Sequence, residues 1–261
     1  MNASELYKAG KLQEAVAAQI NEVKSNPLDQ NRRLFLFELL AFAGELERAA
    51  RQIDALKYEQ VELAATQQGY RRLLDAEGLR RRLFSESLKP EFFATPPDHV
   101  HLRLEAVNRL REGKPAEALA ALDQANAALP AVKGTINGKP FDGLRDADDL
   151  FAGVLEVMAH GVYYWVPLDQ VVAVSSKGPR FPRDLLWLPA RLEMDDASGE
   201  IFLPALYPNS HAHADDQLKL GRTTDWQGGE NAPVLGVGLR TFMVGEDALP
   251  LLEWRELQVS K

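Results

Sequence analysis

"AGKLQEAV" at residues 9–16 and "AGELERAA" at residues 43–50 are two copies of one pattern, 34 residues apart. Each copy has a glycine where two helices would turn, then a leucine, and then an alanine where the helices would cross closely. Tetratricopeptide (TPR) hairpins use these residues at these places, and their period is about 34 residues. "REGKPAEAL" at residues 111–119 carries the pattern again, and Gly78 lies 34 residues after Gly44. The repeat therefore predicts TPR-like helical hairpins.

The hydrophobic pattern changes near residue 130. Before it, apolar residues recur every three to four positions, as in "KLQEAVAAQINEV" at 11–23, which is typical of amphipathic helices. After it come short runs rich in β-formers, separated by Gly, Pro and Asp, with Asn137-Gly138 as a hairpin signal. We therefore predict an α+β chain with a TPR-like helical repeat domain over residues 1–130. A mainly antiparallel β domain is predicted over residues 131–261.

Composition excludes several classes of protein. The 261 residues include no cysteine, so disulfides, thiolate metal sites and a cysteine nucleophile are excluded. The charged N-terminus is unlike a secretory signal, and the sequence has no apolar run of about 18 residues that could span a membrane. We therefore predict a cytoplasmic protein without a membrane partner.

The charge is distributed unevenly along the chain. The net charge is −8, and residues 131–261 carry 12 Lys and Arg against 19 Asp and Glu. An acidic half argues against a nucleic-acid partner, which would need clustered positive charge. The basic clusters are Arg71-Arg72 and Arg80–Arg82. Because Glu77 stands four residues before Arg81, we interpret this stretch as a solvated helix face with i,i+4 ion pairs.

Candidates for chemistry are few. The sequence contains no serine-nucleophile, P-loop or dinucleotide-binding glycine motif. His211 and His213, with Asp215 nearby, are the best candidates for metal ligands, since imidazole and carboxylate both bind divalent cations. The pattern lacks the fixed helical spacing of a zincin motif, and a polar surface loop is the simpler interpretation. A metal-binding protein or metal-dependent enzyme using residues 211–216 stays open as an alternative.

"GRTTDW" at residues 221–226 has two interpretations. Arg222 could hold an anion and Asp225 could act as a base, as in an active-site loop. Alternatively Gly221 permits a bend, Asp225 turns the chain and Trp226 buries its ring. We favour the structural interpretation, because no histidine or lysine partner lies within the stretch. It predicts an internal charged hydrogen-bond network between Arg222 and Asp225.

Five stretches of the second half, taken together and in order, carry a resemblance to a known family. They are "GVYYWVPLDQV" (161–171), "FPRDLLWLPARLE" (181–193), "IFLPALYP" (201–208), "LKLGRTTDW" (218–226) and "GVGLRTFMVGED" (236–247). The sequence resembles the ImpE/SciE family, also called TagJ, whose members are accessory proteins of bacterial type VI secretion. The helical start, with "NPLDQNRRLFLFELLAFAGELERA" at 26–49, is similar as well.

The resemblance implies a non-catalytic cytoplasmic adaptor of the contractile sheath. Some family members bind the small sheath subunit, of the TssB type, through its N-terminal helix, and this implies a link to the sheath-recycling ATPase ClpV. It implies neither catalytic residues nor a cofactor. The signature positions are then structural, and they are Trp165, Pro167, Arg183, Asp184, Trp187, Gly221, Arg222, Asp225 and Trp226.

One helical stretch is a candidate for contact with that partner. "LFLFELLAFA" at residues 34–43 is apolar on nearly every face, so a helix there should be buried by its neighbours. Part of it could instead line a groove for an amphipathic helix. Phe35, Leu39 and Phe42 share one face and would be the anchors, with Arg32 and Arg33 at the rim. A general TPR-type scaffold for another complex is the further alternative.

Overall fold

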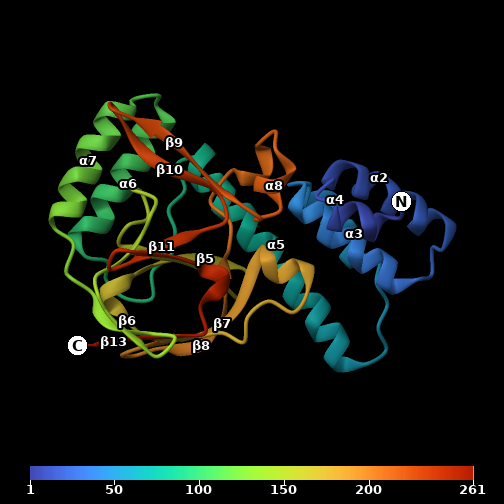
Figure 1. Cartoon of the computed structure of the whole chain (residues 1–261). Coiled ribbons are helices and arrows are strands. Elements are labelled where there is room, and N and C mark those ends of the chain that lie inside the picture. The colour runs from blue at the N-terminus through green and yellow to red at the C-terminus, as the bar shows by residue number, and fades with distance from the viewer. Residues whose placement is uncertain (261) are drawn as a thin grey trace.

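The computed structural model describes residues 1–260, and it places helices before strands along most of the chain (Figure 1). The α+β class predicted from the sequence is confirmed, since a helical first part is followed by antiparallel sheets. The helices are α1 (Ala3–Lys8), α2 (Leu12–Ser25), α3 (Gln30–Phe42), α4 (Leu46–Asp54), α5 (Val61–Ser85), α6 (Asp98–Arg111), α7 (Pro115–Ala127) and the short α8 (Asp216–Lys219).

Three helical hairpins turn at a glycine. Gly10 between α1 and α2, Gly44 between α3 and α4, and Gly113 between α6 and α7 have φ angles of 77°, 80° and 72°. This left-handed conformation favours glycine because it has no Cβ. Gly78 differs, because it lies inside the 25-residue helix α5. The repeat predicted at this position is therefore absent, and one long helix with ion pairs such as Glu77–Arg81 takes its place.

Gly44 is expected to tolerate alanine less well than Gly113. Any side chain costs roughly 1–2 kcal/mol in the left-handed conformation, and Gly113 has open space around it. A Cβ at Gly44 would also lie 2.3 Å from the His211 imidazole. In urea unfolding, Gly44→Ala should therefore lose more stability than the matched Gly113→Ala. Equal losses would show that the contact with His211 contributes nothing.

The second part of the chain forms one large sheet and two small ones. The large sheet has eight strands in the order β2-β1-β13-β6-β7-β8-β4-β5, and all of its pairings are antiparallel. Its strands are β1 (Lys133–Ile136), β2 (Lys139–Asp142), β4 (Val154–Ala159), β5 (Val162–Pro167), β6 (Val171–Ser175), β7 (Trp187–Met194), β8 (Ser198–Pro204) and β13 (Glu256–Ser260).

The two small sheets are built from the remaining strands. One is the hairpin of β9 and β10, and the other has the order β12-β11-β3. These strands are β3 (Leu144–Asp146), β9 (Thr224–Gly229), β10 (Ala232–Gly238), β11 (Thr241–Val244) and β12 (Asp247–Pro250). The hairpin predicted at Asn137-Gly138 is confirmed, since β1 and β2 pair across it and both turn residues have positive φ.

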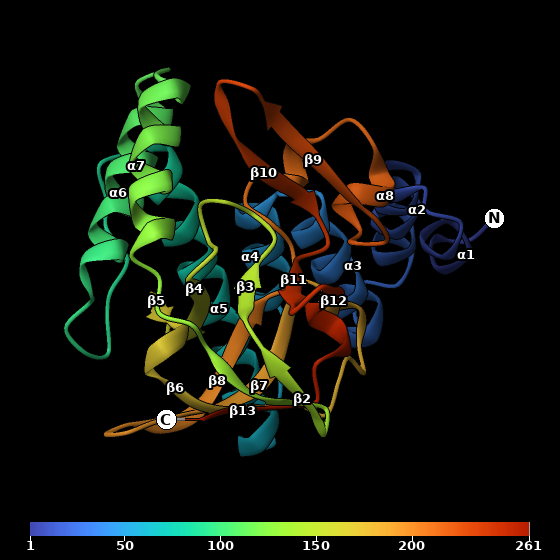
Figure 2. The ribbon, with the colours of Figure 1, turned by 60° about the vertical axis from the view of Figure 1, so that its left-hand side comes forward.

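Helix α5 runs through the middle of the molecule and connects its parts (Figures 1 and 2). Helices α1–α4 lie at one end, while α6 and α7 lie at the other beside the β9–β10 hairpin (Figure 1). The hydrophobic core is continuous across the predicted boundary, because one cluster contains Leu12 and Phe42 together with Phe151, Trp165 and Trp187. The division into domains 1–130 and 131–261 stays a proposal, since a second buried cluster, which includes Leu188, Phe242 and Trp254, lies wholly within residues 131–261.

Candidate functional site

A buried ionic network joins helix α5 to the β part. Glu156 of β4 accepts two hydrogen bonds from Arg80 of α5, from Nε at 2.7 Å and from Nη2 at 2.9 Å. It also accepts from Arg240, just before β11, and from the Tyr163 hydroxyl. Arg240 donates to Asp146 at 2.5 Å, and Tyr207 donates to the same carboxylate at 2.7 Å. All six side chains are buried.

The electrostatics around Glu156 favour its charged form. Burial alone would raise the pKa of Glu156, but Arg80 and then Arg240 lower it below its ordinary value. Arg80 also donates to the Leu206 carbonyl at 2.8 Å. The interpretation of the arginine cluster as a solvated face is therefore wrong for Arg80, although the predicted Glu77–Arg81 pair is present at 3.0 Å. The network is therefore a fixed connection between helix α5 and the β part of the molecule.

A second buried ion pair connects helix α3 to the "FPRD" segment. Arg183 donates to Glu38, the single polar residue of the apolar stretch 34–43, and its Nε donates to the Tyr70 hydroxyl at 2.6 Å. Burial raises the pKa of Glu38, and the Arg183 guanidinium opposes that rise. Arg183 also lies 4.7 Å from the centre of the Tyr70 ring. The pair fixes α3 and α5 to the loop that precedes β7.

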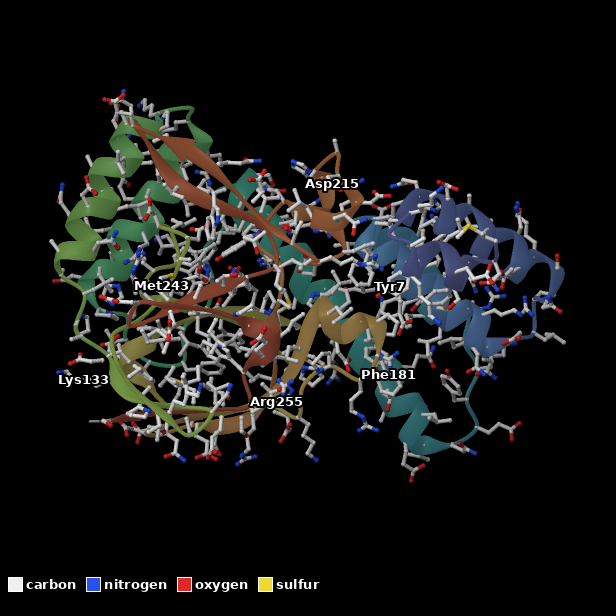
Figure 3. The ribbon with its side chains drawn as sticks, in the orientation of Figure 1. Tyr7, Lys133, Phe181, Asp215, Met243 and Arg255 are labelled. Carbon is white, nitrogen blue, oxygen red and sulfur yellow. The ribbon has the colours of Figure 1, made fainter. Side chains whose placement is uncertain are left out.

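"LKLGRTTDW" holds the N-terminal helices. Arg222 donates to the carbonyls of Tyr7 at 2.5 Å and Lys8 at 3.1 Å, at the C-terminal end of α1. Just before this stretch, Asp216 accepts from the Leu12 backbone N–H at 2.8 Å and so caps α2. The structural interpretation of the loop agrees with these contacts. Figure 3 labels Tyr7 and Asp215, the residue before α8, near the place where the N-terminal helices meet the rest of the molecule.

Two details predicted for that loop are wrong. Asp225 is exposed and accepts from the backbone N–H of Trp226, so it forms no network with Arg222. Arg222 instead finds backbone carbonyls on α1. The Trp226 ring is 40% exposed rather than buried, and it contacts Tyr207 with ring centres 5.8 Å apart. The strand β9 is an exposed edge, so its side chains lack a covering layer.

The other signature residues also have structural surroundings. Trp165 is buried and donates to the Tyr163 hydroxyl at 2.6 Å, while Trp187 donates to Glu77 at 3.4 Å. Asp184 accepts from the backbone N–H groups of Arg180 and Phe181. Pro167 ends β5, and Gly221 has a φ of 63° where a Cβ would lie 2.4 Å from a Leu206 methyl group. These contacts all serve packing or turns.

The predicted metal ligands do not converge. Within residues 1–260, no group of three His, Cys, Asp or Glu residues is placed to hold a metal ion. His211 packs against Gly44, and burial, followed by the charge of Arg81, lowers its pKa to about 4. His213 Nδ1 accepts from the Asp215 backbone N–H, and Asp215 caps α8 through Gln217. The structure therefore does not bring His211, His213 and Asp215 together as metal ligands, because each side chain makes its own local contacts.

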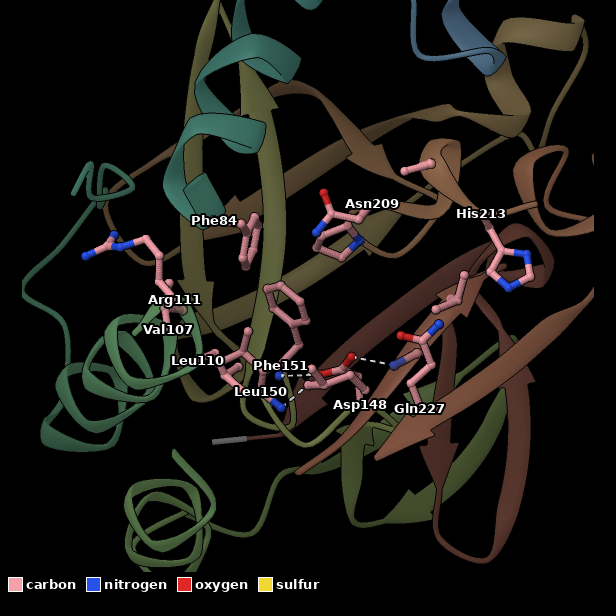
Figure 4. A pocket seen from close by; sticks show the side chains of 15 residues that line it. Phe84, Val107, Leu110, Arg111, Asp148, Leu150, Phe151, Asn209, His213 and Gln227 are labelled. Carbon is pink, nitrogen blue, oxygen red and sulfur yellow. Dashed lines mark hydrogen bonds between the residues drawn. The ribbon is translucent and has the colours of Figure 1, made fainter. Parts of the chain in front are cut away.

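A mainly apolar pocket of about 460 Å³ lies between α6, the end of α5 and β10 (Figure 4). Asp148 lies at its floor, and burial together with Asp146 raises the pKa of Asp148 to about 8. Both carboxyl oxygens of Asp148 are already occupied by backbone N–H groups, those of Leu150 and Phe151 on one side and Gly236 on the other. The lining contains no serine, threonine, lysine or cysteine, and of its possible nucleophiles Asp148 is held by these backbone N–H groups while His213 Nδ1 accepts from the Asp215 backbone N–H.

The structure separates the predicted partner-binding residues. Leu39 and Phe42 are fully buried in the core, so they are no exposed anchors in this conformation. The neighbouring helices cover them, and Tyr7 contacts both Phe42 and Phe35. Phe35 stays half-buried and, with Arg32, lines a hollow of about 520 Å³ between α1, α2 and α3. Arg33 donates to Gln52 and to the Pro27 carbonyl, outside that hollow.

Sequence reasoning missed the buried network. Asp146, Glu156, Tyr207 and Arg240 were not singled out as partners, and Arg80 was assigned to the surface. A signal was present for Glu156, which is the one charged residue of the otherwise apolar "VLEVMA" at 154–159. A carboxylate there must be paired if the strand is buried. The identity of its partners depends on the tertiary fold.

Comparisons with known proteins give one consistent result. A family model described as ImpE protein matches residues 138–258. The chain is 36% identical to a Pseudomonas aeruginosa protein, the "Type VI secretion system accessory component TagJ", over 98% of this chain and 90% of that protein. An X-ray crystal structure of a Vibrio parahaemolyticus protein superposes with a TM-score of 0.89 at 24% identity, over 99% of this chain and 97% of the other. Within residues 1–260, no helix is long and apolar enough to cross a membrane.

Proposed function

The chain belongs to the ImpE family, and from that membership we propose that it is a non-catalytic accessory component of a bacterial type VI secretion system. The observation that carries the proposal is 36% identity to the TagJ protein over 98% of the chain. The signature residues are used for packing, caps and ion pairs between the two parts of the molecule. This use suits a rigid binding protein better than an enzyme.

The partner in this proposal is the N-terminal helix of the small, TssB-type sheath subunit. Phe35 is the one predicted anchor with accessible surface, and Arg32 stands beside it in the hollow between α1, α2 and α3. Phe42 supports this surface from the core, since Tyr7 packs on Phe42 as well as on Phe35. An apolar residue of the partner helix would pack on Phe35, and its carboxylates would compete for Arg32 with Glu22 and Asp29, which pair with it in the free protein. Through the sheath, the protein is linked to the ClpV-type ATPase.

Replacing Phe35 by aspartate should abolish capture of the small sheath subunit. The charge removes the apolar contact at the centre of the hollow, where hot-spot losses are typically about 2 kcal/mol or more. Titration calorimetry with the sheath subunit's N-terminal helix as a synthetic peptide measures the effect. Val61→Asp is the matched control, because Val61 is 78% exposed and lies on α5 outside the hollow.

Folding of both variants is checked by circular dichroism. Leu39→Asp is unsuitable for this test, because Leu39 is fully buried and a charge there would unfold the helix bundle. Full binding by a folded Phe35→Asp variant would refute the hollow as the binding site. Absence of binding by the unchanged protein would refute the sheath partner and favour the alternative, a scaffold for another complex.

A further inference from the structure

Phe181 is an exposed aromatic ring on a surface of the β part. It precedes the single-turn helix Pro182–Leu185, and its side chain is 48% exposed. It lines a hollow of about 610 Å³ whose apolar wall includes Tyr70, Pro189 and Phe202. Figure 3 shows Phe181 on the outside of the molecule, beside α5.

The same surface carries cations without acidic partners. Lys177 and Arg180 line the hollow, and neither forms an ion pair within residues 1–260. Arg255, against which Gly178 packs, donates only to the carbonyls of Leu252 and Trp254. The only other cation in the lining, Arg191, is paired with Glu193 and Glu200. The lining holds three cations, Lys177, Arg180 and Arg191, against the two carboxylates of Asp184 and Glu200, which is a small excess of positive charge on a chain of net charge −8.

The segment that presents Phe181 is held in place. Asp184 accepts from the backbone N–H groups of Arg180 at 2.8 Å and Phe181 at 3.0 Å. The Arg183 guanidinium lies 4.2 Å from the centre of the Phe181 ring and is itself fixed by Glu38. The Ser176 hydroxyl donates to the Pro189 carbonyl at 2.9 Å, which ties the start of the segment to β7. A fixed aromatic ring beside arginines loses little entropy on binding and is typical of a hot spot.

We propose that the hollow around Lys177, Arg180 and Phe181 is a docking site for an acidic segment of a partner protein. An apolar side chain of that segment packs on Phe181, against Pro189 and Phe202. Carboxylates on either side of that apolar side chain pair with Lys177 and Arg180, neither of which forms an ion pair within residues 1–260 of the free protein. This site lies on the β part and is independent of the sheath-helix site proposed at Phe35.

An acidic protein segment fits this surface better than an anionic membrane does. Membrane recognition by basic residues usually takes clusters of roughly 4–8 Lys and Arg. This surface offers fewer, namely Lys177, Arg180 and Arg255. The binding surface is also concave rather than flat. A peptide inserts into such a hollow, whereas a lipid surface does not.

The test uses the full-length protein and a fluorescein-labelled peptide in which Leu-Phe is flanked on both sides by Glu and Asp. Fluorescence anisotropy should show saturable binding that weakens as the NaCl concentration rises. Lys177→Glu/Arg180→Glu and, separately, Phe181→Ser should each weaken binding roughly tenfold or more. Lys139→Glu/Arg145→Glu is the matched control, because it changes the net charge equally at two exposed cations outside the hollow.

Each alternative outcome has a definite meaning. Binding that is lost in both site variants and kept in the control supports the proposal. If Phe181→Ser left binding unchanged, or if the control variant weakened binding as much as Lys177→Glu/Arg180→Glu does, the binding would be unspecific charge attraction. Either result would overturn the proposal. Stronger binding to phosphatidylserine vesicles than to the peptide would overturn it in favour of a membrane, and no saturable binding would also overturn it.

Discussion

Glu156→Ala is expected to lower the free energy of unfolding by about 3–5 kcal/mol, as is typical when one partner of a buried ion pair is removed. Glu156 accepts hydrogen bonds from Arg80, Arg240 and Tyr163, and all four side chains are buried. Its loss leaves two guanidinium groups with too few counter-charges inside the protein. Urea unfolding, followed by circular dichroism, measures the change.

Glu200→Ala is the matched control for this prediction. Glu200 is also a glutamate on a strand of the large sheet, but its side chain is 81% exposed. Its replacement should change the free energy of unfolding by less than about 0.5 kcal/mol. If Glu156→Ala lost as little as this control, the buried network would not stabilise the junction between α5 and the β part.

Glu38→Leu alone is expected to be strongly destabilising, and a second substitution, Arg183→Met, should recover most of the loss. Either single substitution leaves one charged group buried without its partner, at a typical loss of about 3–5 kcal/mol. The double variant replaces the pair by apolar side chains of similar length, and such replacements are often neutral or stabilising. A double-mutant cycle of unfolding free energies measures the coupling.

The cycle distinguishes a buried pair from two unrelated contacts. Additive losses in the double variant would show that Glu38 and Arg183 act separately. The side chains are 5% and 9% exposed, so screening by solvent is weak and the coupling should be large. Arg183→Met also removes the hydrogen bond from Arg183 Nε to the Tyr70 hydroxyl, but this loss occurs in both the single and the double variant and therefore cancels in the coupling energy.

Local signals were sufficient for much of the fold. Glycine before a helical period identified the turns at Gly10, Gly44 and Gly113, and Asn-Gly identified the turn between β1 and β2. The turn predicted at Gly78 was wrong, because glycine is also tolerated inside a helix when other interactions stabilise that helix. Spacing alone does not distinguish a turn glycine from a helical one.

The site depended on contacts between residues far apart in the sequence. Arg80 looked like its neighbours Arg81 and Arg82, but only Arg80 faces Glu156, which lies 76 residues later. Arg222 was recognised as structural, yet its partners are carbonyls on α1, 214 and 215 residues earlier. Backbone acceptors leave no trace in side-chain patterns, so this docking could not be predicted from the sequence.

The cap on α2 has a consequence for synthesis on the ribosome. The N-terminal helices are translated first, but the carboxylate of Asp216 that caps Leu12 is made 204 residues later. The guanidinium of Arg222 that closes the end of α1 follows still later. The nascent N-terminal segment therefore cannot complete these hydrogen bonds until residues 216 and 222 have been made, and until then water is the partner of these helix ends.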